Sequence, residues 1–242
     1  MQAARPEIIF HLASLVTGRR ELDLVLPAFR DNLASTVNLL TAAASTGGCR
    51  RIVVAGTMEE ADLASGEAPS SPYSVAKGAA ALYARFFHAL YGLPLVQARI
   101  FMAYGPGQQD RKKLIPYSIL EALAGRPPEI SRGTRRIDWI FVDDVVRGLL
   151  AFAETPGIEG ETLDLGSGDL VSAREVVERI CHALQAPAPR IGALPDRPLE
   201  ATRRANVERT TAHAGWRPTI GLDEGLHRTI IALRGERPDD RA

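Results

Sequence analysis

The chain has very little cysteine, and this excludes two classes of protein. Its 242 residues include only Cys49 and Cys181, and neither lies in a C-x-x-C or Cys/His spacing. A disulfide framework needs more cysteines, and a structural zinc site needs clustered ligands. The sequence therefore predicts neither a disulfide-stabilised secreted domain nor a metal site.

Long apolar runs and a net charge are also lacking. No apolar run reaches the roughly 20 residues that a membrane-spanning helix needs. Residues 1–10 show no basic region followed by an apolar stretch, so no signal peptide is visible. The 29 basic and 29 acidic residues balance, which leaves no net field to attract nucleic acid or an anionic membrane. We expect a soluble, cytoplasmic protein that binds neither nucleic acid nor membranes.

What the sequence does contain is an alternation of strand and helix patterns. Buried strands are predicted in "EIIFHLAS" (7–14), "RIVVAG" (51–56) and "LVQARIFMAYGPG" (95–107), each ending in small or polar residues. Amphipathic helices are predicted at 27–46, before the Gly47–Gly48 pair, and at 72–90. This order predicts an α/β fold with a doubly wound parallel sheet.

The regular alternation of predicted strands and helices changes after residue 107. A helix is predicted at 113–125, a strand running into a helix at 136–155, and a short strand at 160–168. A further helix begins at Ser172, with Glu175 three residues later as in a capping box. A last amphipathic helix follows near the end of the chain, and the chain is long enough for one large domain or two small ones.

Tyr73 and Lys77 form the most informative pair. In the predicted helix they are four residues apart and so share one face. The chain has five tyrosines and only three lysines, so chance would give about 0.06 such pairs. A tyrosine beside an ammonium can act as a general acid–base; the alternative is a packed tyrosine and a solvated lysine on a surface helix.

Several motifs in a fixed order resemble one known family. "HLAS", "AGTMEE", "PYSVAK" and "FMAYGPG" follow one another, and "GTRRIDWIFVDDVVRGL" and "HAGWRPTIGLDEGLHRTI" come later. Together they resemble the extended short-chain dehydrogenase/reductase family of nucleotide-sugar epimerases, dehydratases and reductases. The resemblance implies an NAD or NADP cofactor and a nucleotide-sugar substrate. It also implies a Rossmann-like dinucleotide-binding domain (1–107 and 137–168) and a smaller substrate-binding domain (108–136 and 169–242).

The resemblance also implies residue roles. Tyr73 matches the catalytic acid–base, Lys77 the residue that binds the ribose and lowers the tyrosine pKa, and Thr57 the hydroxyl that orients the sugar oxygen. The implied cofactor-binding residues are Leu12, Ala13, Asn32, Tyr73, Lys77 and Ile100. Without the resemblance, Thr57 would be a strand-end cap and Asn32 an ordinary polar helix residue. We interpret His11 as a packed strand residue rather than a base.

The substrate side departs from the family pattern. Met102 replaces an asparagine that usually contacts cofactor or substrate, and Met58 follows Thr57 where dehydratases have an aspartate. A thioether can supply neither the hydrogen bond of the asparagine nor the proton of the aspartate. The loss of that aspartate favours an epimerase or ketoreductase over a dehydratase. Arg136 lies one position from the family's late-strand arginine, which on a strand turns it to the other face. The implied substrate-binding residues are Thr57, Met58, Glu59, Met102, Arg136 and Arg197, with Arg203 a weaker candidate.

The family's glycine-rich fingerprint, G-x-x-G-x-x-G, occurs nowhere after a predicted strand. Either Met1 is an internal methionine of a longer protein or the gene is shortened. Without the family's first three strands, the strand at 7–14 would be an exposed apolar edge of the sheet. A homodimer through the helices 28–46 and 72–90 is expected from the resemblance. The alternative function is a catalytically impaired remnant that binds a nucleotide sugar or only dimerises.

We predict that residues 1–242 by themselves bind NADH and NADPH weakly. Dinucleotide affinity in this fold depends on backbone amides of a glycine loop at a helix N-terminus, which hold the pyrophosphate. Losing several such bonds leaves a dissociation constant of about 1 mM or weaker. Fluorescence titration of the purified chain measures it, and a micromolar constant would contradict the prediction.

Overall fold

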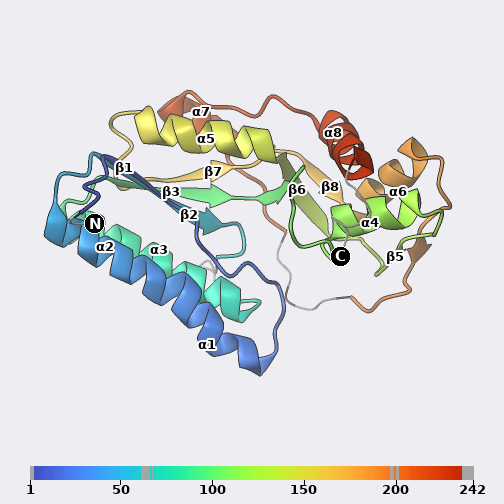
Figure 1. Cartoon of the computed structure of the whole chain (residues 1–242), viewed down its shortest axis with the longest axis horizontal. Helices are drawn as coiled ribbons and strands as arrows, with labels where there is room; N and C mark the ends of the chain where they lie inside the picture. The colour runs from blue at the N-terminus through green and yellow to red at the C-terminus, as the bar shows by residue number, and fades with distance from the viewer. Residues whose placement is uncertain (1–2, 61–65, 67, 197–198, 200–201, 236–242) are drawn as a thin grey trace. The chain divides into compact units, whose positions relative to one another are not determined.

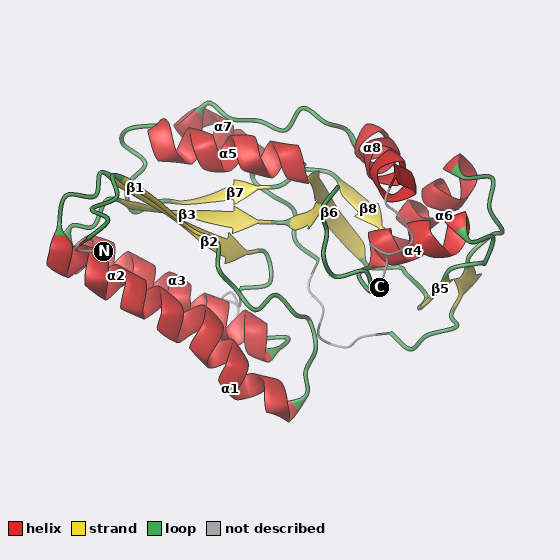
Figure 2. Ribbon diagram, viewed as in Figure 1, coloured by secondary structure: helices red, strands yellow, loops and turns green. Residues whose placement is uncertain are grey.

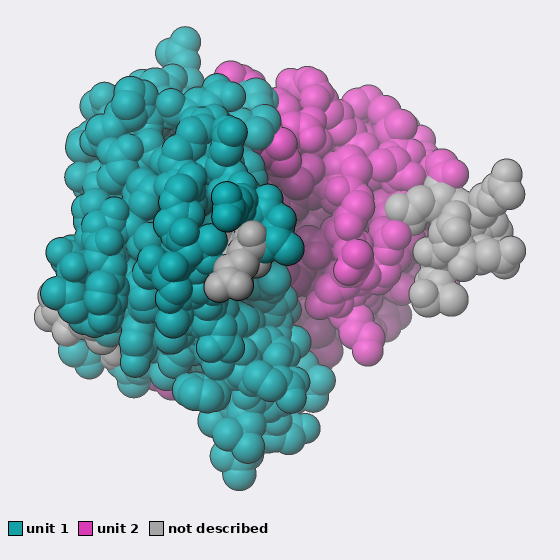
Figure 3. Space-filling view, turned by 60° about the vertical axis from the view of Figure 1, so that its left-hand side comes forward, with its two compact units in different colours: residues 1–101, 147–165, 206–217 teal, residues 102–146, 166–205, 218–242 magenta. Residues whose placement is uncertain are grey.

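A computed structural model describes residues 3–60, 66, 68–196, 199 and 202–235. The chain forms two compact units, coloured separately in Figure 3. The first comprises residues 1–101, 147–165 and 206–217, and the second comprises residues 102–146, 166–205 and 218–242. The assignment of a dinucleotide-binding and a substrate-binding role to parts of the chain stays a prediction.

A four-stranded parallel sheet forms the centre of the first unit. Its order is β1 (Ile8–His11), β2 (Arg51–Thr57), β3 (Leu95–Ile100) and β7 (Thr162–Leu165). All seven residues of β2 are buried, as expected for a strand covered on both faces. The predicted α/β fold with a parallel central sheet is confirmed, and β1 is an edge strand of this sheet.

Helices cover both faces of this sheet. In Figure 2, α2 (Ser35–Thr46) and α3 (Pro72–Tyr91) lie on one face, and α5 (Val142–Glu154) and α7 (Val207–Ala214) on the other. The core between the sheet and α2 and α3 consists of apolar side chains, among them Leu40, Ile52, Ala84, Phe87 and Leu95. The sheet therefore presents the carboxyl ends of its strands between two helical layers, where ligand sites of such folds lie.

The helix predicted at 27–46 is longer and less regular than expected. It begins with a 3₁₀ turn (Leu22–Leu24) and α1 (Val25–Ala28), passes through a π-helical turn (Phe29–Ala34) and continues as α2. Gly47 ends it with φ +67°, in the region that favours glycine. π-helical turns are frequent at functional sites, which directs attention to this segment.

Helix α3 begins and ends where its sequence predicts. The Ser71 side chain caps it by accepting a hydrogen bond from the Ser74 amide, and Pro72 occupies the first turn. Gly92, in the left-handed conformation, ends it. This well-defined start fixes the position of Tyr73, which is the second residue of the helix.

The second unit has a small mixed sheet of β4 (Met102–Tyr104), β6 (Arg136–Phe141) and β8 (Leu170–Ser172). β4 and β6 are parallel, whereas β6 and β8 are antiparallel, a pair that the strand–helix alternation did not predict. The short strands β5 (Glu129–Ile130) and β9 (Arg190–Ile191) form a second sheet. Figure 1 shows these strands together with α4, α6 and α8.

Three helices complete the core of this unit: α4 (Leu114–Leu123), α6 (Ala173–Ala183) and α8 (Leu222–Gly235). They bury Ile119, Val176 and Ile230 around Trp139. The capping box of Ser172 and Glu175 is confirmed, because each side chain bonds the other residue's backbone amide. Among the described helices, none is both long and apolar enough to cross a membrane.

The buried carboxylate of Asp138 organises the loops of the second unit. It is 0% exposed and accepts hydrogen bonds from the backbone amides of Ser167 (2.6 Å), Gly168 (3.0 Å) and Ala205 (3.0 Å). A buried carboxylate requires such partners, and here they come from two separate loops. Asp138 therefore ties these loops to β6.

Candidate functional site

The first unit brings three hydroxyl groups together beyond the ends of two strands. Ser14 lies in the loop after β1, Thr57 is the last residue of β2, and Tyr73 lies in the first turn of α3. The side chains of Thr57 and Ser14 lie close enough to the Tyr73 hydroxyl for hydrogen bonding to lower its pKa. Tyr73 and Thr57 are each 7% exposed, so this polar cluster is nearly closed to solvent.

The environment of Tyr73 favours its protonated form. Burial raises the pKa of the Tyr73 hydroxyl to about 12, and the negative charges of Glu59 and Glu60 act in the same direction. The hydrogen bonds with Thr57 and Ser14 oppose this rise. The lowered pKa expected from the sequence is therefore not found in the ligand-free chain, because desolvation outweighs the hydrogen bonds.

Lys77 is buried one helical turn after Tyr73. It is 3% exposed, and its Nζ donates a hydrogen bond of 2.8 Å to the carbonyl oxygen of Ala55 on β2. Burial lowers the pKa of the Lys77 ammonium to about 8, while the negative charge of Glu60 raises it. The alternative of a solvated surface lysine is wrong, since the side chain points toward the sheet rather than into solvent.

Asn32 fixes the loop that carries Ser14. Its Oδ1 accepts hydrogen bonds from the Ser14 hydroxyl (2.6 Å) and the Leu15 amide (2.9 Å), and its Nδ2 donates to the Leu15 carbonyl (3.2 Å). Asn32 is 0% exposed and lies in the π-helical turn. The amide thus links this helix to the end of β1 and holds Ser14 against Tyr73.

Ser14 is the site residue that the sequence reasoning missed. It is the last letter of the strand-end motif "HLAS", and its place after a buried strand was the available signal. A lone serine in a loop carries no specific pattern, and only the folded chain brings the loop after β1 to Tyr73.

His11 is a packed strand residue, as interpreted from the sequence. Its Nε2 lies 2.8 Å from the Thr36 Oγ1, and that hydroxyl donates its proton to the Asn32 carbonyl at 2.7 Å. Because the Thr36 hydroxyl donates its only proton to Asn32, it must accept in its hydrogen bond with His11, and we assign the proton of that bond to His11 Nε2. Burial and the nearby charge of Lys77 lower the pKa of His11, which favours the neutral imidazole.

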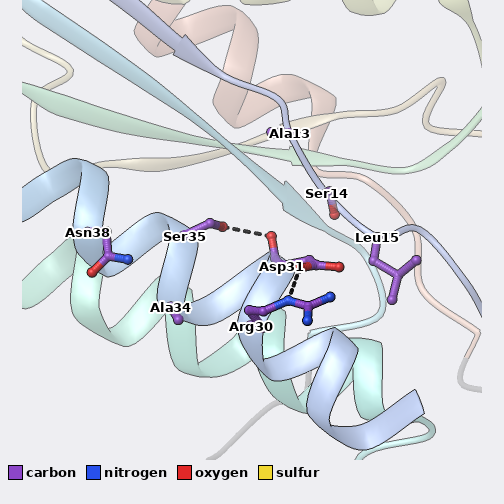
Figure 4. A pocket seen from close by; sticks show the side chains of 8 residues that line it. All are labelled: Ala13, Ser14, Leu15, Arg30, Asp31, Ala34, Ser35 and Asn38. Carbon is purple, nitrogen blue, oxygen red and sulfur yellow. Dashed lines mark hydrogen bonds and ion pairs between the residues drawn. The ribbon is translucent and has the colours of Figure 1, made fainter. Parts of the chain in front are cut away.

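An open pocket of about 600 Å³ adjoins the loop after β1 (Figure 4). It is lined by Ala13, Ser14, Leu15, Arg30, Asp31, Ala34, Ser35 and Asn38. Arg30 pairs with the Asp31 carboxylate at 2.8 Å, and the Ser35 hydroxyl donates to the Asp31 carbonyl at 2.7 Å. Ala13, a predicted cofactor residue, therefore lies at a hollow of the surface rather than in the core.

The other predicted site residues of the first unit lie near the strand ends. Leu12 (49% exposed) and Ala13 follow β1, and Ile100 ends β3. The Met58 amide donates to the Ile100 carbonyl (3.0 Å), and the Glu59 amide donates to the Thr57 hydroxyl (3.2 Å). These contacts gather the predicted residues around the carboxyl ends of β1, β2 and β3.

The remaining predicted substrate-binding residues that the structure describes lie in the second unit. Met102 begins β4 in the second unit, and Arg136, on β6 of the same unit, is exposed and donates to the Leu170 carbonyl at 2.7 Å. Arg203 also lies in the second unit. Arg197 lies outside the described residues. The roles of all these residues stay predictions.

Comparison with known proteins establishes the family. A sequence model of the NAD dependent epimerase/dehydratase family matches residues 1–166. The chain belongs to this family, which confirms the resemblance drawn from its motifs.

The chain matches two curated relatives and covers a different share of the length of each. The chain is 36% identical over 176 residues to a dTDP-glucose 4,6-dehydratase of Neisseria gonorrhoeae, a match that covers 67% of this chain and 50% of that protein. It is 31% identical over 250 residues to a UDP-glucose 4-epimerase of Mycolicibacterium smegmatis, covering 96% and 77%. The chain thus spans about half the length of the first of these relatives.

Solved structures share the fold. MoeE5, in complex with UDP-glucuronic acid and NAD, has 31% identity and a TM-score of 0.84, covering 94% of this chain and 79% of that one. The epimerase Mth375 of Methanothermobacter thermautotrophicus has 27% identity and a TM-score of 0.82, covering 96% and 73%. These likenesses confirm the Rossmann-like architecture.

We predict that Asn32→Ala destabilises the chain by about 2–3 kcal/mol, because it leaves the Leu15 amide and carbonyl without their partner. The exposed Asn38 on the same helix provides a matched control, and Asn38→Ala should change stability by less than about 0.5 kcal/mol. Urea unfolding measures both variants. Equal stabilities of the two would show that Asn32 does not anchor the loop.

Proposed function

We propose that the chain is an NAD(P)-dependent nucleotide-sugar epimerase or ketoreductase that acts by hydride transfer at Thr57, Tyr73 and Lys77. The observation that carries the proposal is the buried Tyr73 hydroxyl, which lies within hydrogen-bonding reach of Thr57 and one helical turn from the buried Lys77. Relatives with these names and ligands support it, since they include a UDP-glucose 4-epimerase and a protein bound to UDP-glucuronic acid and NAD.

The proton chemistry follows from the hydroxyl cluster. Bound NAD would supply the hydride acceptor for oxidation of a sugar alcohol, and the Tyr73 oxygen, once deprotonated, would take the proton of the reacting hydroxyl. The Thr57 hydroxyl donates a hydrogen bond to the reacting oxygen. With a pKa of about 12, Tyr73 is suited to give a proton in the reverse step, and a nearby positive charge must lower its pKa before it can act as a base.

The donors of the site fit a dinucleotide's sugar. The Lys77 ammonium has three N–H donors, and its hydrogen bond to Ala55 uses one of them. A ribose offers hydroxyl oxygens that the others can bind. Leu12 and Ala13 lie exposed beyond β1, where their backbone can approach a ligand. We assign these residues, together with Asn32 in the π-helical turn and Ile100 at the end of β3, to the cofactor side of the site.

An epimerase or ketoreductase is favoured over a dehydratase by Met58. Elimination of water needs an acid next to the hydroxyl that leaves, and a thioether cannot supply a proton. Met58 is also 3% exposed, so it packs in the core of the first unit. Glu59 remains as the substrate-side carboxylate, and its backbone amide bonds the Thr57 hydroxyl.

A second candidate is a binding or dimerising module without turnover. It is favoured by Met102, whose thioether cannot donate the hydrogen bond that an asparagine at this position would give. The two candidates differ in one observable property: only the enzyme oxidises or epimerises a bound nucleotide sugar.

We predict that Tyr73→Phe lowers kcat by about 10³-fold or more, because it removes the group that exchanges the proton. The assay supplies millimolar NAD with UDP-, TDP-, GDP- or CDP-sugars and follows product and reduced cofactor. Tyr91→Phe on the same helix is the control, since Tyr91 is 54% exposed and removing its hydroxyl keeps its ring contacts. Undiminished turnover in Tyr73→Phe would refute the assignment, and binding without any wild-type turnover would support the second candidate.

We also propose a homodimer through the helices that cover one face of the sheet. α1 and the π-helical turn after it pack beside α3, and these segments expose a set of large apolar side chains: Val25, Leu26, Phe29, Val75, Leu82, Tyr83, Phe86 and Leu90. An apolar surface of this kind is typical of a protein interface. The alternative, that these helix faces only pack on the sheet, does not account for their exposed apolar residues.

We predict that Phe86→Glu produces a monomer, because a buried interface cannot accommodate an unpaired charge. Light scattering after gel filtration measures the mass. Ile231→Glu is the matched control, since Ile231 is likewise exposed (55%) but lies on α8 of the second unit. A wild-type monomer at micromolar concentration would contradict the proposed dimer.

A further inference from the structure

Two buried polar residues of one helical segment hold the loop after β1. Asn32 lies in the π-helical turn and is 0% exposed, and Thr36 is the second residue of α2 and is 1% exposed. The Thr36 hydroxyl donates to the Asn32 carbonyl at 2.7 Å, so the two residues are also bonded to each other. Buried polar side chains need partners on the element that covers them, and here that element is the end of β1 with its loop.

The two residues hold opposite ends of the loop. His11, the last residue of β1, has its Nε2 2.8 Å from the Thr36 Oγ1. Four residues later, the Asn32 side chain bonds both the amide (2.9 Å) and the carbonyl (3.2 Å) of Leu15. Residues 12–14 are thus fixed on both sides to the same turn of helix.

The residues between these anchors belong to the cofactor side of the proposed site. Leu12 and Ala13 are exposed, and Ser14 donates its hydroxyl proton to the Asn32 Oδ1 at 2.6 Å. Ala13, Ser14 and Leu15 also line the open pocket of Figure 4. An exposed loop opens easily unless its ends are anchored, because few buried contacts hold it. The anchors therefore determine where the backbone of this loop lies when a ligand binds.

The direction of the His11–Thr36 hydrogen bond follows from a count of protons. A threonine hydroxyl has one proton, and Thr36 gives it to the Asn32 carbonyl, which can only accept. The bond to His11 therefore needs a proton on the His11 Nε2. In a neutral imidazole Nδ1 is then unprotonated. Burial and the charge of Lys77 lower the pKa of His11, which favours this neutral form.

We propose that His11 is a positioning residue of this site: through its Nε2–H it holds Thr36 and the helical turn of Asn32 against the end of β1, so that Asn32 keeps the loop in place for the cofactor. The catalytic meaning of this role rests on the proposed function, whereas the tautomer and the order of the loop can be measured without turnover. His11 acts through Thr36 and Asn32 and not on the reacting atoms.

His88 provides a reference for the opposite tautomer within the same unit. Its Nδ1 lies 2.9 Å from the Leu93 carbonyl oxygen, which only accepts, so His88 carries its proton on Nδ1. The chain has five histidines, and His11→Gln and His88→Gln identify the two sets of ring resonances. ¹⁵N spectra at about pH 8, where an ordinary imidazole is neutral, distinguish the tautomers. A proton on the His11 Nε2, opposite to His88, supports the proposal, and a proton on the His11 Nδ1 overturns it.

Two substitutions of His11 separate the hydrogen-bond donor from the bulk of the ring. The amide nitrogen of a glutamine takes roughly the place of Nε2, and that of the shorter asparagine takes roughly the place of Nδ1. His11→Gln therefore keeps a donor for Thr36, and His11→Asn does not. Hydrogen exchange of the Leu15 amide, which Asn32 binds, is the readout. Its protection should stay near the wild-type value in His11→Gln and fall about tenfold in His11→Asn, the size expected from one lost hydrogen bond.

The Gln97 amide is the control for general destabilisation. It lies on β3, an inner strand of the same sheet, and donates to the Glu161 carbonyl at 2.9 Å. A loss of protection at Leu15 that leaves Gln97 unchanged in His11→Asn supports the positioning role. An equal loss at both amides overturns it, and so does unchanged protection of Leu15 in His11→Asn.

A second pair of variants serves if His11→Asn does not fold. Thr36→Val keeps the shape of the side chain but removes the hydroxyl that joins His11 to Asn32, and Thr36→Ser keeps that hydroxyl. Protection of the Leu15 amide should fall in Thr36→Val and persist in Thr36→Ser. Equal protection in the two Thr36 variants would overturn the proposal.

Turnover tests the catalytic meaning of the role separately. His11→Asn should lower kcat/KM for NAD about tenfold, and more than it lowers kcat, because the loop contributes to binding the cofactor. His11→Gln should restore most of this loss. Absence of wild-type turnover would refute the proposed function and leave the tautomer and exchange results intact. A less protected Leu15 amide with unchanged kcat/KM for NAD would overturn the role of His11 in positioning the loop for the cofactor.

Discussion

A buried tyrosine hydroxyl must have hydrogen-bond partners, and the site of the first unit is arranged around this requirement. Tyr73 is 7% exposed, and the hydroxyl groups within its reach are those of Ser14 and Thr57, which come from the ends of two different strands. Each strand end is in turn held by a buried polar side chain: Asn32 bonds the loop that carries Ser14, and Glu60 bonds the amide of Thr57. The parallel sheet supplies the common edge, and these amide and carboxylate groups fix the geometry there.

The same burial that orders the site also sets its electrostatics. Desolvation raises the pKa of Tyr73 to about 12 and lowers that of Lys77 to about 8, which favours the neutral form of each. Two neighbouring groups with shifted pKa values are typical of functional sites, because residues with a purely structural role rarely keep a buried charge against its desolvation cost. In the proposed reaction, a nearby positive charge would have to lower the pKa of Tyr73 before it could act as a base.

The sequence predicted the parts of the fold whose patterns are local. The buried strands β2 and β3, the extent of α3 and the Ser172–Glu175 capping box follow from residues within one segment, whereas β1, also predicted as buried, is partly exposed. The antiparallel β6–β8 pair and the π-helical turn at Phe29–Ala34 do not follow from one segment, because they depend on contacts with distant parts of the chain. For the site, motif order indicated Thr57, Tyr73 and Lys77. It could not indicate Ser14, or that Glu60 turns back onto Gln97 through the space left by Gly56, since only the assembled sheet brings these groups together.

The central claim is that hydride leaves the sugar at a carbon whose oxygen exchanges a proton with Tyr73. The most direct measurement is the transfer of deuterium. UDP-glucose deuterated at every sugar carbon is mixed with the protein and NAD in a single turnover, and the cofactor is isolated for mass spectrometry. The account predicts deuterium in the reduced cofactor trapped by rapid quenching during the turnover of the wild type, and a large decrease with Tyr73→Phe. Turnover of the sugar in which the cofactor trapped during the reaction never carries deuterium would contradict it.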